Sequence, residues 1–232
     1  MIPHHQILLT CEHATNHVPA EFRPFLKNHR SLLDSHRAFD PGAFELFTRM
    51  AKKFRCPAFS FPVSRLLIEA NRSKHHPALF SSVTRPLTQE IKSALLTKYY
   101  LPYRTKVENA IHALLAQKKK VLHLSIHSFT PVLNGIPRNT DVGLLYDPRR
   151  SSEKEFCKVW KKSLHAQNPG LLVRFNHPYR GIADGFTTHL RKQFQNPHYA
   201  GIELEVNQKF PLGNSASWQS LQEQIMRSLP RV

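Results

Sequence analysis

Short apolar runs of strand length alternate along this chain with longer segments of helical periodicity. Strands are predicted where apolar and β-branched residues cluster, over residues 6–11, 58–63, 66–69, 121–126, 142–146, 171–175 and 201–206. Helices are predicted over residues 42–54, 88–120, 153–165, 185–193 and 216–229, the second one broken or kinked at Pro102. Strands and helices that alternate in this way indicate an α/β fold.

One domain over residues 1–232 accounts for the whole chain. No internal repeat, low-complexity segment or long linker divides it. Residues 71–86 and 129–140 have no predicted structure and directly follow strands. We expect binding residues on these two loops, because loops at strand ends often carry function.

The composition excludes several classes of protein. Hydrophobic residues make up 41% and charged residues 21%, which is neither a disordered nor a fibrous composition. No apolar run approaches the roughly 18 residues of a membrane-spanning helix. The N-terminus lacks a signal-peptide pattern, and the three cysteines are too widely spaced for a disulfide framework or a zinc knuckle. We therefore expect a cytoplasmic protein that does not act in a membrane.

The formal net charge of +17 leaves three explanations open. A nucleic-acid partner would use such charge to neutralise phosphates, but Lys and Arg are spread along the whole chain and no nucleic-acid-binding module is present. The densest run, Lys118-Lys119-Lys120, falls where a helix is predicted to end, and cations there complement the helix dipole. An ordinary basic surface, or attraction of a small anionic substrate, is favoured over nucleic acid.

Two histidines stand out because each one follows a predicted strand. His13 lies in the segment CEHATNHVP, and His127 ends the apolar run HLSIHS. Side chains at strand ends gather at the rim of a sheet, where α/β active sites form. A surface or capping role remains the simpler explanation for either one alone, among 15 histidines. His123 lies about 13 Å from His127 along an extended strand, too far to share an ion, and we expect it in the core.

Two carboxylates could complete a hydrolytic site. Asp40 precedes Pro41 and could be an ordinary helix N-cap, or it could join two imidazoles on a zinc ion whose fourth position is left for water. Glu203 and Glu205 share one face of a predicted strand, and Glu205 is nearer the carboxyl end. We expect Glu205 to be a general base, with exposure on an edge strand as the alternative.

Asn71 and Arg72 follow the strand predicted at residues 66–69. An amide beside a planar guanidinium is suited to holding a substrate carboxylate at two points. For this dipeptide alone, a turn asparagine beside a surface arginine is the favoured explanation. The motifs G-x-S-x-G, G-x-x-x-x-G-K-[ST] and H-E-x-x-H are absent, which removes the commonest rival mechanisms.

Taken in order, six segments of the chain resemble the N-formylglutamate amidohydrolase family: CEHATNHVP, FDPGAFELF, SRLLIEANR, HLSIHSFTP, DVGLLYD and IELEVNQ. The resemblance covers about residues 7–208. It implies a single-domain three-layer sandwich related to the zinc carboxypeptidases and phosphorylase/hydrolase-like folds, with a mixed, largely parallel sheet of about eight strands between helices. It also implies cleavage of the formyl group from N-formylglutamate, or from a similar small anionic N-acyl amino acid.

The resemblance also implies a site with one zinc ion per chain. His13 and His127 would be its imidazole ligands and Asp40 its third ligand. Zinc carboxypeptidases have a glutamate three residues after the first histidine, where this chain has Asn16, so Glu12 and Asn16 also stay open as the third ligand.

The remaining roles implied by the resemblance belong to catalysis and substrate binding. Glu205 would be the general base, and Arg72 would stabilise developing negative charge. The expected substrate-binding residues are Arg65, Asn71, Arg72 and Ser128.

Two other functions remain open. One is a metallo-amidase or peptidase with a different substrate, because this chain has CEHA where better-known relatives have P-H-[SA]-G, and because residues 129–139 could select differently. The other is a catalytically idle, basic binding protein on the same scaffold. The sequence leaves the oligomeric state open.

Overall fold

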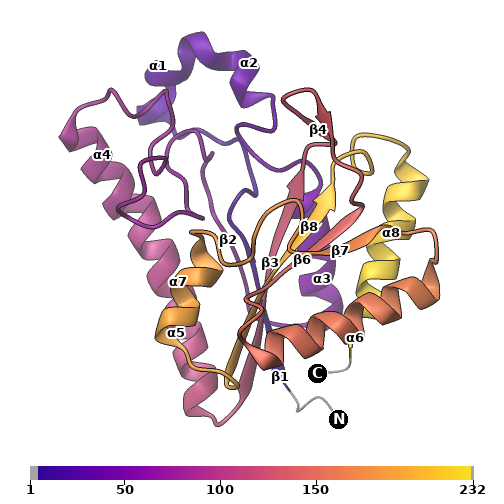
Figure 1. The fold of residues 1–232 in the computed structure, drawn as a ribbon. Helices are drawn as coiled ribbons and strands as arrows, with labels where there is room; N and C mark the ends of the chain where they lie inside the picture. Colours follow the sequence, from indigo (N-terminus) through magenta and orange to yellow (C-terminus); the bar gives the residue numbers. More distant parts are fainter. Residues whose placement is uncertain (1–4, 231–232) are drawn as a thin grey trace.

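The computed structural model describes residues 5–230 and contains one central sheet (Figure 1). Its six strands lie in the order β2-β1-β3-β8-β6-β7. Their bounds are β1 His5–Cys11, β2 Ala58–Ser60, β3 Lys120–Phe129, β6 Val142–Leu145, β7 Val173–Phe175 and β8 Tyr199–Asn207. Strands β2, β1, β3 and β8 are parallel, and β6 joins β8 antiparallel with β7 parallel to it. The sheet is therefore mixed and largely parallel.

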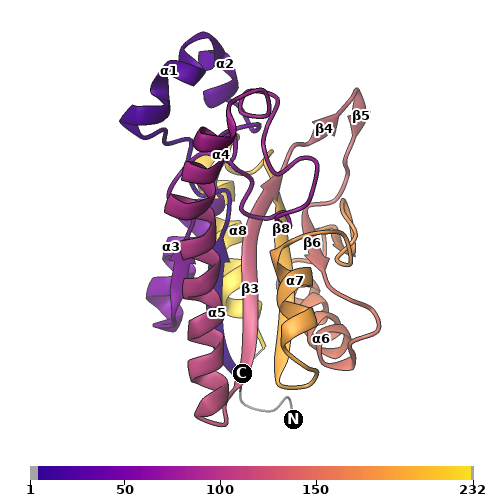
Figure 2. The same cartoon turned by 90° about the vertical axis from the view of Figure 1, so that its left-hand side faces the viewer.

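Helices cover both faces of this sheet and make a three-layer sandwich (Figure 2). Helices α3 (Ala43–Phe54), α6 (Ser151–Gln167) and α8 (Ser215–Ser228) supply apolar side chains to the core on one face. The other core contains side chains from α4 (Gln89–Leu95), the π-helical segment η3 (Leu96–Tyr100), α5 (Leu101–Ala116) and α7 (Phe186–Gln193). No helix within residues 5–230 is long and apolar enough to cross a membrane.

The predicted α/β sandwich is confirmed, with a smaller sheet than expected. Six strands form the sheet instead of about eight, and β4 (Val132–Leu133) and β5 (Ile136–Pro137) make a separate hairpin inside a segment predicted to be an irregular loop. Short helical turns also occupy residues 20–33, where none was predicted.

Residues 66–69 were wrongly predicted as a strand. They form turns, and Leu66, Leu67 and Ile68 are apolar because they are packed inside the second core. Burial of a compact turn therefore produced the same apolar run as a strand.

Pro102 does not break the long helix. It lies in the first turn of α5, where the missing amide donor costs little, and η3 joins α5 to α4. The helix ends at Ala116 instead of Lys120, because Lys118 has a left-handed φ of 60° and Lys120 begins β3.

Toward their carboxyl ends, β1, β3 and β8 place apolar residues on one face and mainly polar residues on the other. In β3, Leu122, Leu124 and Ile126 join the first core, whereas His123, Ser125 and His127 alternate with them. All six side chains are buried, so the polar face must be satisfied inside the protein. In the register with β8, Ser125 pairs with Glu203 and His127 with Glu205. Polar groups of neighbouring strands therefore meet near the carboxyl ends.

Candidate active site

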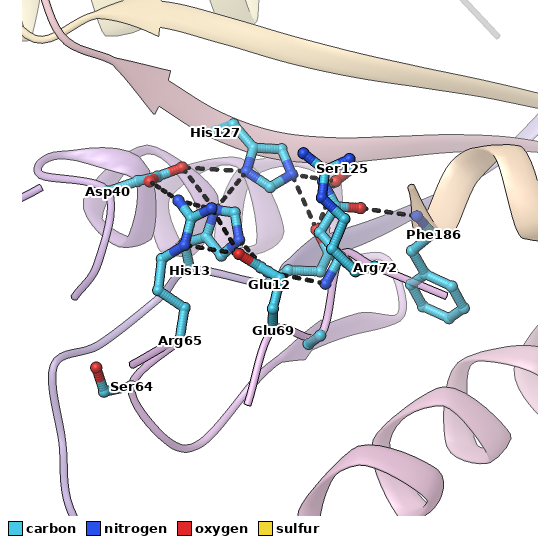
Figure 3. A network of polar contacts seen from close by, with 12 residues as sticks. Glu12, His13, Asp40, Ser64, Arg65, Glu69, Arg72, Ser125, His127 and Phe186 are labelled. Carbon is cyan, nitrogen blue, oxygen red and sulfur yellow. Dashed lines mark hydrogen bonds and ion pairs between the residues drawn. The ribbon is translucent and has the colours of Figure 1, made fainter. Parts of the chain in front are cut away.

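Three potential ligand atoms converge at the carboxyl ends of β1 and β3 (Figure 3). His13 Nδ1 lies 3.0 Å from Asp40 Oδ2, His127 Nδ1 lies 3.1 Å from the same oxygen, and the two nitrogens are 3.1 Å apart. The three atoms form a nearly equilateral triangle, and we call His13, Asp40 and His127 the triad. Among residues 5–230, no other three His, Cys, Asp or Glu side chains form such a group.

Different parts of the fold deliver these three side chains. His13 follows β1, His127 is near the end of β3, and Asp40 lies in the segment that leads into α3. The Asp40 carboxylate does not cap that helix, since the N-cap is Gly42, whose left-handed φ of 79° suits glycine. Asp40 instead accepts a hydrogen bond of 3.2 Å from the Ser128 amide. Asp40 therefore faces the two histidines.

Each histidine contacts a second carboxylate through the other nitrogen of its ring, Nε2. Glu69 Oε1 lies 2.6 Å from His13 Nε2, and Glu12 Oε2 lies 3.1 Å from His127 Nε2. A carboxylate accepts hydrogen bonds, so each Nε2 carries the proton and each Nδ1 keeps a lone pair in the neutral ring. Ser125 donates to Glu12 at 2.6 Å and lies 2.9 Å from His127 Nε2. Both imidazoles are thereby held with Nδ1 toward Asp40.

This donor set requires a positive charge. With both rings neutral, the lone pairs of His13 Nδ1, His127 Nδ1 and Asp40 Oδ2 oppose one another at 3.0–3.1 Å. Burial opposes charge on the rings, but the carboxylates outweigh it and raise the pKa of His13 and, further, that of His127. Protons or a metal cation would relieve the repulsion.

Zinc fits the three atoms. Imidazole and carboxylate ligands at about 2.0–2.2 Å in a tetrahedral site lie about 3.3–3.6 Å apart, only a few tenths of an ångström more than the separations here. Two histidines and one carboxylate also leave a fourth position open. The two other ligand candidates do not reach this site, because Asn16 is exposed and Glu12 contacts the far side of the His127 ring.

Glu205 lies next to His127 across the β3–β8 register. It is buried, it lines the same pocket as the triad, and its Oε2 has no hydrogen-bond partner within residues 5–230. Strand β8 is interior to the sheet, so the edge-strand explanation for this residue is wrong. Burial raises the pKa of Glu205 to about 8. A cation held at the triad would favour its carboxylate form.

Arg65 contacts two members of the triad, His13 and Asp40. Its guanidinium forms ion pairs of 2.5 Å with Glu69 and 3.4 Å with Asp40, and its Nη1 lies 3.2 Å from His13 Nδ1. Arg65 therefore places positive charge beside the three ligand atoms and is itself neutralised by Glu69.

Asn71 and Arg72 line the pocket beside this group. Asn71 Oδ1 accepts a 2.7 Å hydrogen bond from the backbone amide of Phe186 at the start of α7. The backbone amide of Asn71 donates to Glu69 Oε1 at 3.1 Å. The Arg72 guanidinium donates to the backbone oxygen of Asp184. It makes no other side-chain hydrogen bond or ion pair within the part of the chain described. Its remaining donors are available to a ligand.

Ser128 and His123 have mainly structural contacts. The Ser128 hydroxyl donates to Pro41 O at 2.7 Å and lies 3.1 Å from the Gln208 amide nitrogen, although Ser128 also lines the pocket. His123 is buried between Thr10 and Tyr199, 2.7 Å from each hydroxyl. His123 is therefore a core residue, as predicted.

The pocket has a volume of about 180 Å³, and its outer wall comes from residues 176–184, the turn after β7. This turn packs against β6. A Cβ atom added at Gly143 in β6 would lie 2.2 Å from the backbone oxygen of His177 and 3.2 Å from the Cβ of Glu205. The lining of the pocket contains three arginines, the two histidines of the triad, four carboxylates and four other residues. In full it is His13, Asp40, Arg65, Asn71, Arg72, His127, Ser128, Tyr179, Arg180, Ala183, Asp184, Glu203 and Glu205.

Sequence reasoning missed two kinds of residue: the carboxylates that contact the predicted histidines, and the residues of the turn that lines the pocket. Glu69 lies in the segment SRLLIEANR, and a glutamate just before Asn-Arg was a signal for it. Glu12 was considered only as a ligand. Tyr179 and Arg180 could have been found from the turn-forming residues Asn176, Pro178 and Gly181 after a predicted strand.

Comparisons with known proteins agree with this architecture. The chain superposes with a TM-score of 0.80 and 24% identity on the product of gene Atu2144 of Agrobacterium tumefaciens, over 97% of this chain and 90% of that one. An N-formylglutamate amidohydrolase from Ralstonia eutropha aligns with a TM-score of 0.68 and 19% identity, over 99% and 93% of the two chains. At these identities the likeness establishes the fold alone. No curated protein matches the sequence.

The sequence model of a single family spans nearly the whole domain. It matches residues 5–210, a range that includes β1, the His13–Asp40–His127 triad, Asn71, Arg72 and Glu205. The chain therefore belongs to the N-formylglutamate amidohydrolase family, a family of amidohydrolases.

Proposed function

We propose that this protein is a zinc-dependent amidohydrolase that removes the formyl group from an N-formyl amino acid of the N-formylglutamate class. The observation that carries the proposal is the convergence of His13 Nδ1, His127 Nδ1 and Asp40 Oδ2, each histidine backed by a carboxylate. Family membership supports amide hydrolysis as the reaction.

One metal site per chain is part of this proposal, supported by the arrangement of His13, Asp40 and His127. His13, Asp40 and His127 would hold the zinc ion, which would supply Lewis acidity toward an amide carbonyl and a water molecule. Glu69 and Glu12 keep the two rings oriented toward the metal site.

Glu205 is the general base in this proposal. Its Oε2 is buried in the pocket without a protein partner, so it is free to accept a proton from the attacking water. The same carboxyl then returns that proton to the nitrogen of the departing amine. Formate and the free amino acid are the products.

Arginines stabilise the negative charges of substrate and transition state. Arg65 Nη1 lies beside the triad, where charge develops on the carbonyl oxygen. The open donors of Arg72, with Asn71 next to it, are suited to the α-carboxylate of the substrate.

Metal analysis and formate release test the proposal together. Protein purified without added metal should contain about one zinc per chain and release formate from N-formylglutamate. Removal of the metal by a chelator should abolish release, and zinc should restore it. His127→Ala should lose both metal and turnover, whereas His75→Ala, which changes an exposed histidine, should keep both.

A metal-free protein that zinc does not activate would contradict the proposal and favour an idle binding protein. Zinc binding with turnover only of other amides would favour the metallo-amidase alternative. Full metal retention in His127→Ala would show that the ligand set is wrong.

A further inference from the structure

The outer wall of the pocket is a turn held in one conformation by several backbone contacts. Asn176 Oδ1 accepts hydrogen bonds of 3.0 Å from the amides of Tyr146 and Gly181. Arg191 donates to the Gly181 oxygen at 2.6 Å. Gly181 also packs so closely on β6 that an added Cβ would lie 2.2 Å from the Tyr146 nitrogen. Of the four residues between Asn176 and Gly181, Tyr179 and Arg180 line the pocket, and they therefore project from a fixed platform.

Tyr179 is already engaged on this platform. Arg138 donates a 3.0 Å hydrogen bond to its hydroxyl, and the guanidinium lies 5.1 Å from the centre of its ring. Arg138 follows the β4–β5 hairpin, so this contact joins the turn to the hairpin. Tyr179 and Arg138 thus satisfy each other.

Three arginines line the pocket, and they differ in how far the protein neutralises them. Arg65 is paired with Glu69 and Asp40. Arg72 is bound to a backbone oxygen. Arg180 is exposed, and its side chain makes neither an ion pair nor a hydrogen bond within residues 5–230.

The pocket's carboxylates do not neutralise Arg180 either. Asp184 accepts from the Ser73 amide at 3.0 Å, and Glu203 accepts from the Thr187 hydroxyl. Glu205 is buried beside His127. A guanidinium without an anionic partner therefore faces a cavity of about 180 Å³ that also contains the triad.

We propose that Arg180 determines specificity by binding a carboxylate on the side chain of the substrate. This inference rests on the proposed function, in which Arg72 holds the α-carboxylate. Arg72 and Arg180 come from different loops and line the same small cavity. A substrate whose amide reaches the triad and whose α-carboxylate reaches Arg72 can extend a short side chain toward the turn, where a guanidinium binds a carboxylate in two-point fashion.

The test compares wild-type protein, Arg180→Met and Arg180→Glu on N-formylglutamate, N-formylglutamine and N-formyllysine. Methionine keeps much of the length of arginine and removes its charge. Arg180→Met should lower kcat/KM for N-formylglutamate about 10- to 100-fold, mainly through KM, because a charge-assisted hydrogen bond made away from the reacting atoms is lost. N-formylglutamine should change less than about threefold.

Charge reversal and a matched control complete the kinetic test. Arg180→Glu should turn the preference from N-formylglutamate toward N-formyllysine. Arg174→Met changes an exposed arginine of β7 that does not line the pocket, and it should leave the selectivity as in the wild type. Equal effects of Arg180→Met on all three substrates, or no effect, would overturn the proposal.

Calorimetric binding of L-glutamate and L-glutamine separates this inference from the proposed function. The wild type should prefer glutamate, and Arg180→Met should lose that preference. If no formyl compound is hydrolysed while this preference is present and depends on Arg180, the proposed function fails and the specificity assignment stands. A wild type that does not distinguish the two amino acids would refute the assignment, whatever its turnover.

Discussion

The two walls of the pocket differ in how the protein holds them. The floor consists of four buried groups that line the pocket, His13, Asp40, His127 and Glu205, and of the two buried carboxylates that contact the histidines, Glu12 and Glu69. The rim consists of the turn at residues 176–184, part of which lines the pocket, and of the β4–β5 hairpin, which Arg138 joins to this turn through Tyr179. Exposed fractions on the floor are at most 6%, whereas Ile136 and Tyr179 on the rim are 68% and 44% exposed.

Under the proposed function, this difference separates the residues of the reaction from those that select the substrate. Nearly every polar atom of the floor contacts a second polar atom of the floor, so removing one group leaves a buried partner unsatisfied. Side chains of the rim face solvent, and a substitution there leaves few such partners. The floor is therefore suited to a reaction whose geometry must not vary, and the rim is suited to change between related substrates.

The largest effect on turnover short of metal loss is expected from Glu205→Gln. The amide cannot take a proton from water, so turnover should fall about 10²- to 10⁴-fold while zinc content stays at one per chain. Formate release and elemental analysis on the same sample measure both. Glu203→Gln, two residues away on the same face, is the matched control and should retain much more activity. Unchanged turnover in Glu205→Gln would remove the residue from its role.

A smaller effect, on metal affinity, is expected from Glu12→Gln. Glu12 orients His127 from behind and does not reach the ligand triangle, so zinc should still bind, about 10- to 100-fold more weakly. Competition with a chromogenic chelator measures the affinity, and circular dichroism checks the fold. Glu21→Gln, a change at an exposed glutamate, should leave affinity as it is. An unaltered zinc affinity in Glu12→Gln would show that the floor does not act as one network.

The smallest effect is expected on the rim. Ile136→Ser at the exposed hairpin should change the free energy of unfolding by no more than about 0.5 kcal/mol. Ile126→Ala, in the buried face of β3, should cost about 2–5 kcal/mol. Urea unfolding of both variants gives the comparison. A loss of several kcal/mol in Ile136→Ser would mean that the hairpin belongs to the core of the fold.

The floor was more predictable than the rim. The position of His127 at the end of an apolar run, and of Glu205 near the carboxyl end of another strand, pointed to these two residues, and the α/β class followed from periodicity. The triad residues lie together as predicted, although their metal-binding role stays a prediction. The roles of Glu12 and Glu69 could not be read locally, because their partners His127 and His13 are far away in the chain.

The rim lacked any comparable pattern. Strands of two residues are too short to show alternation, and β4 and β5 were therefore taken for loop. The platform of Arg180 depends on the contact of Asn176 with Tyr146, some 30 residues away. Such contacts arise from tertiary packing, and no local propensity encodes them.

Gly143 belongs to both walls, since an added side chain would meet the backbone of the turn on one side and Glu205 on the other. Under the proposed function, a substitution of Gly143 would therefore affect the general base and the turn that carries Arg180 at the same time. A directed-evolution library that randomises Tyr179 and Arg180, and keeps Gly181 and Gly143, would sample new substrates without disturbing Glu205 or the turn. A library that also varies Gly143 would disturb the turn and Glu205 in the same clones. This glycine should therefore be kept while the turn is varied.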